Sequence, residues 1–97
     1  MDYLSFEAHE GDDGIWTLEA CASTPAAQHA TVMAEVQQVL DWARQQFPNS
    51  HGPVEDGADW LHDLQVGVEG GQWHAVTLTL AASGRFADAF LAVFGAL

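Results

Sequence analysis

The sequence predicts an α+β fold in which a four-stranded antiparallel-type sheet carries both of its helices on one face. Three observations predict it: two pairs of segments with alternating polarity, a helical apolar repeat after each pair, and a length of 97 residues, which suits one domain. The order ββαββα results when the last strand of a ferredoxin-like βαββαβ plait is moved to the front. We therefore expect a single α+β domain over residues 1–97, a two-layer sandwich with this circularly permuted plait as the favoured topology.

The first two predicted strands flank a turn rich in glycine and acidic residues. Residues 3–8 alternate between apolar and polar side chains, and the alternation resumes over residues 16–22. Between them, residues 9–14 are turn formers. The two strands are therefore expected to form a hairpin.

The segment 25–47 has apolar residues at spacings of three and four and predicts the first helix. The Ser-Thr-Pro sequence at residues 23–25 supplies a capping hydroxyl and a proline, which the first turn of a helix tolerates. Pro48 ends the helix, and residues 48–58 form a loop. The predicted apolar stripe consists of Met33, Val36, Val39, Leu40, Ala43 and Phe47.

The second half repeats this order. Residues 60–69 and 72–82 alternate, and Gly70-Gly71 between them accepts positive φ at both positions, which predicts a tight hairpin. Ser83 then caps a last helix. Its predicted stripe consists of Phe86, Ala89, Phe90, Val93 and Leu97, with Leu91 and Phe94 off the stripe as candidates for a C-terminal interface.

In the permuted plait, the strand 72–82 inserts between the strands 16–22 and 60–69, and the first helix crosses over to the third strand. The alternative topology lays the two hairpins side by side without insertion. Both helices cover one face and leave the other open. Trp73 would be an exposed aromatic at the middle of this open face. Because a small open-faced sheet buries a marginal core, we expect a homodimer.

The charge balance excludes several classes of function. Two Lys+Arg stand against 14 Asp+Glu, which gives a net charge of −12 with histidine neutral, and both basic residues are arginines. Binding to nucleic acid or to an anionic membrane needs clustered basic residues, so neither is expected as a partner. The absence of lysine excludes Schiff-base chemistry and a phosphate-binding loop that ends in Gly-Lys.

The remaining composition points to a cytoplasmic protein. No run approaches the roughly 18 apolar residues of a membrane span. The N-terminus does not have the basic start and apolar stretch of a secretory signal. Cys21 is the single cysteine, so neither an internal disulfide nor a thiolate zinc cluster can form.

Carboxylates gather in two segments, residues 9–14 and 55–63. The first does not have the alternation of a calcium-binding loop and fits a solvated turn. We expect a non-enzymatic interaction module whose acidic surface docks onto a basic protein, as an inhibitor, an immunity protein or a nucleic-acid mimic would. The candidate partner-binding residues are Asp12, Asp13, Glu55, Asp56, Asp59, Asp63 and Trp73.

Two other functions are open. In a metal-binding or small-ligand-binding plait domain, His62 and His74 would approach each other on the inner faces of adjacent strands, but zinc catalysis needs a third protein ligand that the sequence does not identify. In a small dimeric enzyme, the site would lie on the open sheet face and use His74 or Asp63. We expect no metal or other cofactor and no catalytic residue, because no serine lies in a nucleophile turn.

Overall fold

The last strand in the sequence, β4 (Trp73–Ala82), is a central strand because it pairs on both sides. In the computed structural model, which describes residues 2–95, β4 runs antiparallel to β2 (Trp16–Pro25) and to β3 (Trp60–Glu69) over ten residues each. The short strand β1 (Glu7–Glu10) pairs with β2 at one edge, so the order is β1-β2-β4-β3. The α+β class with a four-stranded antiparallel sheet is confirmed, and β4 is inserted rather than placed outside the third strand.

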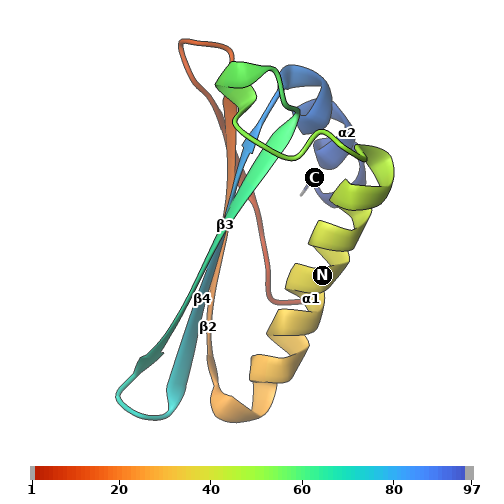
Figure 1. Cartoon of the computed structure of the whole chain (residues 1–97). Coiled ribbons are helices and arrows are strands. Elements are labelled where there is room, and N and C mark those ends of the chain that lie inside the picture. The colour runs from red at the N-terminus through yellow and green to blue at the C-terminus, as the bar shows by residue number, and fades with distance from the viewer. Residues whose placement is uncertain (1, 96–97) are drawn as a thin grey trace.

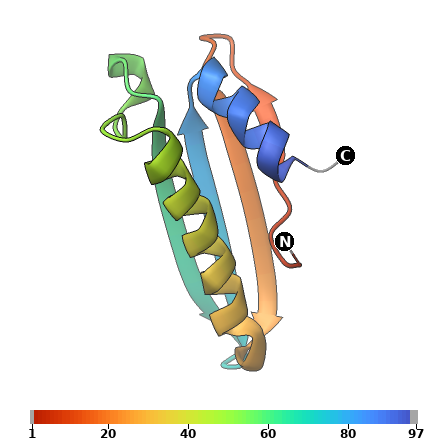
Figure 2. The same ribbon diagram turned by 90° about the vertical axis from the view of Figure 1, so that its right-hand side faces the viewer.

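Both helices pack on the same face of this sheet (Figures 1 and 2). The long helix α1 (Ala26–Gln46) connects β2 to β3, and α2 (Gly84–Phe94) follows β4. A short 3₁₀ turn, η1 (Val54–Asp56), precedes β3. Neither α1 nor α2 is both long and apolar enough to cross a membrane. The inner face is lined by buried side chains of the two central strands, Leu18, Ala20, Val76, Leu78, Leu80 and Ala82.

The predicted element ends were correct for one helix cap and wrong for the other. The Ser83 hydroxyl accepts a hydrogen bond from the Phe86 amide at 3.3 Å, as expected of an N-cap. Ser23 and Thr24, in contrast, belong to β2, and α1 begins after Pro25 without a side-chain cap. The Ala26 amide instead donates to the carbonyl of Gln72 in the β3–β4 turn.

The apolar face of α2 differs from the predicted stripe. Val93 is 58% exposed, while Phe94 packs against Phe90 at a ring-centroid distance of 4.9 Å and against Trp42 of α1 at 5.4 Å. The row at spacing four, Phe86-Phe90-Phe94, therefore faces α1, and Val93 lies to one side of it. Leu97 lies outside the described residues. In α1, Val36, Val39, Leu40 and Ala43 are buried as predicted.

A buried carboxylate on α1 fixes the N-terminal segment. Glu35 is 8% exposed, and its two oxygens accept hydrogen bonds from the amides of Asp2, Tyr3 and Leu4 at 2.9–3.2 Å. These bonds hold residues 2–4 against the helix, so that Leu4 enters the core while β1 begins only at Glu7. The predicted strand over residues 3–8 is therefore displaced toward the turn.

We predict that Glu35→Ala destabilises the protein by about 2–3 kcal/mol, because buried amides would be left without acceptors. Urea denaturation measures the change in unfolding free energy. Glu55→Ala, which removes an exposed carboxylate, serves as the control and should change stability by less than about 0.5 kcal/mol. Equal stability of the two variants would contradict this assignment for Glu35.

Candidate functional site: an acidic sheet face

Three carboxylates form a row across the outer face of the sheet. The strand register places Glu7 opposite Glu19, Glu19 opposite Thr79, and Thr79 opposite Asp63, so one residue from each of the four strands lies in the row. Neighbouring strands are about 5 Å apart, which puts Glu7 about 5 Å and Asp63 about 10 Å from Glu19 along the sheet surface. All three carboxylates are exposed or partly exposed.

The neighbours of this row are neutral hydrogen-bonding groups and one histidine. Thr79 donates to Glu19 at 3.4 Å, and the Gln65 amide donates to Asp63 at 3.3 Å. The His9 imidazole lies 3.9 Å from Glu7, and the side chains of both residues are strongly exposed. The row therefore remains a line of negative charge that faces solvent.

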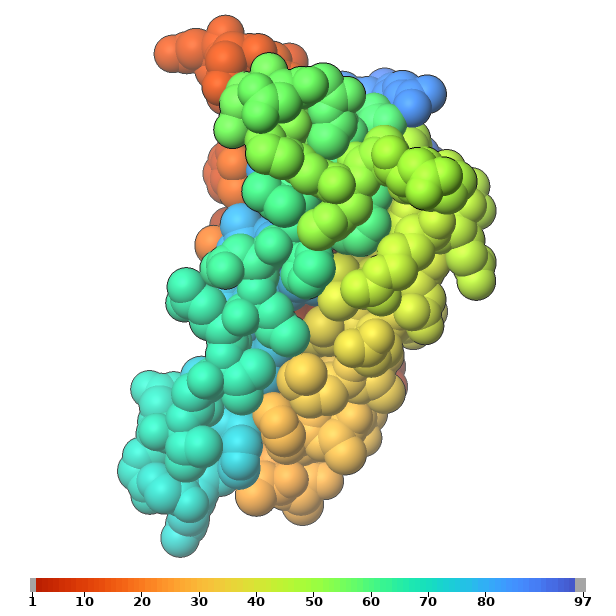
Figure 3. Space-filling model, viewed as in Figure 1, coloured from red at the N-terminus to blue at the C-terminus, as the bar shows by residue number. Residues whose placement is uncertain are grey.

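The two acidic segments predicted from the sequence lie at the same end of the sheet. Asp12 and Asp13 occupy the β1–β2 turn, and Glu55 and Asp56 lie in η1, directly before β3. Both segments lie at the end opposite the β3–β4 hairpin, as the space-filling view shows (Figure 3). The Asp13 carboxylate also accepts the Ile15 amide at 3.0 Å, which shapes the turn.

Asp59, predicted as a partner-binding residue, is instead committed to an internal ion pair. Its carboxylate accepts two hydrogen bonds from the Arg85 guanidinium, at 2.9 and 2.6 Å, and one from the Ser83 hydroxyl at 2.9 Å. The carboxylate thus links the start of β3 to the N-terminus of α2. The guanidinium of Arg85 also lies over the Phe47 ring, 5.3 Å from its centroid. Asp59 is therefore structural rather than part of an exposed surface.

The other arginine is also paired within the chain. Arg44 lies 3.6 Å from Asp41, one turn earlier on α1. Both arginines of the protein thus interact with internal carboxylates. Neither lies in the carboxylate row, and so no arginine neutralises it.

The Arg85 and Ser83 hydrogen bonds hold the pKa of the Asp59 carboxyl well below its ordinary value of 3.8. Because the folded state favours the ionised form, this contribution to stability is present above pH 3.8 and is lost as the pH falls through the lower, folded pKa. We predict that Asp59→Asn costs about 1–3 kcal/mol at neutral pH. Thermal melts should show the difference from wild type narrowing in strong acid; a constant difference would contradict the ion-pair assignment.

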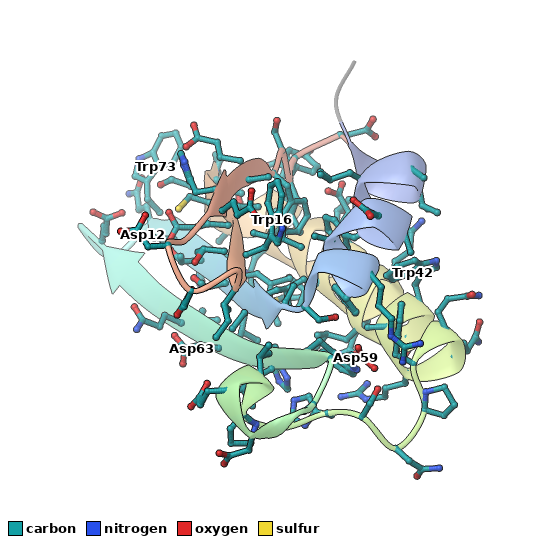
Figure 4. All side chains as sticks on the ribbon, turned by 90° about the horizontal axis from the view of Figure 1, so that it is seen from above. Asp12, Trp16, Trp42, Asp59, Asp63 and Trp73 are labelled. Atoms are coloured by element: carbon teal, nitrogen blue, oxygen red, sulfur yellow. The ribbon has the colours of Figure 1, made fainter. Side chains whose placement is uncertain are left out.

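Trp73 does not lie at the middle of the open face, contrary to the prediction. It is 49% exposed and is the first residue of β4, paired with Pro25 and Glu69 beside the β3–β4 turn. Nine residues of extended strand separate it from the acidic end, a distance of about 30 Å. In the view from above, Trp73 and Asp63 lie on the side of the sheet away from Trp42 (Figure 4). Trp73 and the acidic turns therefore belong to different ends of the molecule.

The predicted approach of His62 and His74 does not occur. His62 pairs with Leu80 in the register and His74 lies six residues away along β4, about 20 Å distant. His62 instead hydrogen-bonds to His51 at 2.9 Å between Nδ1 and Nε2. His74 lies against His29 of α1, with ring centroids 4.5 Å apart. The structure thus forms two other histidine pairs.

The His29–His74 pair lies among buried polar atoms that have no hydrogen-bond partner in the described part of the chain. They are Nδ1 of both imidazoles, Thr24 Oγ1 and Gln28 Oε1. Unpaired buried polar atoms usually bind an internal water. No group of three or more histidine, cysteine, aspartate or glutamate residues within 2–95 is arranged to hold a metal ion.

Burial lowers the pKa of His62 below its ordinary value of 6.5, and His51 and Arg44 lower it further, while Asp63 acts in the opposite direction. Protonation of His62 therefore favours unfolding, and its neutral form is the one that the fold stabilises. We predict that stability falls as the pH drops through 6.5, and that His62→Gln reduces this fall. Urea denaturation between neutral and mildly acidic pH tests it; identical pH profiles of variant and wild type would contradict it.

Alternation placed Glu7 and Glu19 on the open face, but sequence reasoning did not include them among the candidate site residues. The signal that joins them to Asp63 is the strand register, which alternation alone does not determine. Comparison of the chain with protein-family models, with curated proteins and with solved structures finds no match. The argument for function therefore depends on the geometry of the site.

Proposed function

We propose that the protein is a small acidic, non-enzymatic interaction module that docks onto a basic protein surface. The docking surface would be the acidic face, which we define as the carboxylate row together with the acidic residues of the two turns. The observation that supports this most is the row itself, where three carboxylates line up across four strands while both arginines are paired elsewhere. The acidic face comprises Glu7, Asp12, Asp13, Glu19, Glu55, Asp56 and Asp63.

The acidic face suits recognition of a basic protein for two physical reasons. Unneutralised carboxylates on one side of a small molecule attract a cationic partner from a distance and orient it during the encounter. At contact, the row offers acceptors at spacings of about 5 and 10 Å, and arginine or lysine side chains can bind these in charge-assisted hydrogen bonds. Thr79 and Gln65 add neutral polar groups between the charges.

An inhibitor, an immunity protein or a mimic of nucleic acid would act in this way. We place this activity in the cytoplasm, since Cys21 is exposed and free, which fits a reducing compartment. Self-association is a separate proposal. The outer face is polar in the row around Glu19 and Thr79, so it does not offer the apolar centre of a stable homodimer interface.

The test compares two variants with the same net charge. The face variant combines Glu7→Gln, Glu19→Gln and Asp63→Asn; the control variant combines Asp2→Asn, Glu69→Gln and Asp88→Asn, all at exposed positions outside the acidic face. Each serves as bait for basic proteins in a cell extract, and the affinity of the captured partner is then measured. We expect the face variant to lose about tenfold or more in affinity, the control variant much less, and wild-type binding to weaken with salt.

Equal losses in the two variants would mean that net charge alone attracts the partner, and they would contradict a specific docking face. Binding that does not respond to salt would contradict the electrostatic mechanism. Capture of basic proteins by wild type and both variants alike would therefore count against the proposal.

A further inference from the structure

The outer edge of β3 presents unpaired backbone groups near the β3–β4 hairpin. The amide and the carbonyl of Trp60 both bond outward, to Ser50 and Gly52. Because alternate residues of a strand direct these groups to the same side, the amides and carbonyls of Leu64, Val66 and Val68 also point away from β4. In residues 2–95, β3 pairs on this outer side only at Trp60, through a bridge to His51.

This edge is apolar and carries none of the usual protection against strand pairing. Val66 is 48% and Val68 59% exposed, on the face that the helices cover elsewhere. Residues 64–68 contain no charge and no proline, and their register with β4 has no bulge. Native edge strands are normally protected by such features. The hairpin also extends beside the start of α1 rather than beneath it (Figure 1).

We propose that the β3 edges of two copies of this chain pair antiparallel about a two-fold axis and join the two sheets. A second copy fits better than a basic partner, because no carboxylate lies between Asp63 and Glu69 to attract a cation. The second copy brings an equally neutral, apolar strand with the matching backbone groups. This proposal stands independently of the acidic face, which lies at the other end of the sheet.

The charges at the ends of this segment determine the register. An axis at Val66 would place Asp63 opposite the partner's Glu69, and two like charges directly opposite each other are unfavourable. An axis at Gly67 places Val66 opposite the partner's Val68 and Gln65 opposite the partner's Glu69, to which the amide can donate. This register also avoids the segment 50–52, which already occupies the outer side at Trp60.

The dimer should be weak and favoured by salt. A pairing limited to the hairpin end of one strand buries a small area, so the dimer forms only as concentration rises. Each chain has a net charge of −12, and salt screens the repulsion between two copies. Salt thus has opposite effects on the two proposals: it promotes this dimer and weakens docking of a basic protein.

Sedimentation velocity over a concentration series in high salt tests the pairing. Val66→Lys places a charge on the edge, and Val93→Lys adds the same charge at a comparably exposed valine on α2. Wild type and Val93→Lys should both dimerise, whereas Val66→Lys should raise the dissociation constant about tenfold or more. Circular dichroism establishes that both variants are folded. A monomeric wild type, or equal dimerisation of Val66→Lys and Val93→Lys, would overturn the proposal.

Gln65→Lys tests the register and does not depend on the behaviour of Val66→Lys. In the Gly67-centred dimer, each lysine lies opposite the partner's Glu69, so the dimer should tighten beyond the effect of the same charge at Val93→Lys. A dimer no tighter than that of Val93→Lys would overturn this register. Val66→Lys should bind a basic partner as wild type does, so failure of one proposal is distinguishable from failure of the other.

Discussion

The pairing of β4 on both sides is the constraint on which the rest of the structure depends. Because β4 lies between β2 and β3, α1 must pass over β4 to connect these two strands, and α2 then returns to the same face. One face of the sheet is therefore buried, as the exposures of 0–1% for Val76, Leu78 and Leu80 show. The same constraint leaves the other face and the outer edge of β3 without cover, and these are the two surfaces to which we assign interactions.

The internal use of both arginines gives the uncovered face its character. Arg85 links Asp59 and the Phe47 ring near the start of β3, and Arg44 pairs with Asp41 on α1. A second buried requirement is met by Glu35, whose carboxylate holds the N-terminal amides without a basic partner. The net charge of −12 thus arises less from many acids than from few bases, and those bases stabilise the fold instead of neutralising the outer face.

The elements whose patterns are local could be predicted from the sequence. Alternation located β3 and β4, and Gly70 and Gly71 adopt the positive φ values that the tight turn requires, 60° and 76°. Features set by distant partners could not be predicted. The late start of β1 depends on Glu35, the commitment of Asp59 depends on Arg85, and the carboxylate row depends on a register across all four strands. Helical spacing alone also did not show that α2 faces Trp42 with Phe94 rather than Val93.

The central claim is that a basic protein is recognised by the outer face of the sheet at its acidic end. Nuclear magnetic resonance mapping with an arginine-rich peptide as the cationic probe tests it most directly. We expect the largest amide shifts at and around Glu7, Glu19 and Asp63 and in the two acidic turns, with reversal in high salt. Shifts that centre on the exposed surfaces of α1 and α2, or that spread evenly over all exposed carboxylates, would contradict it.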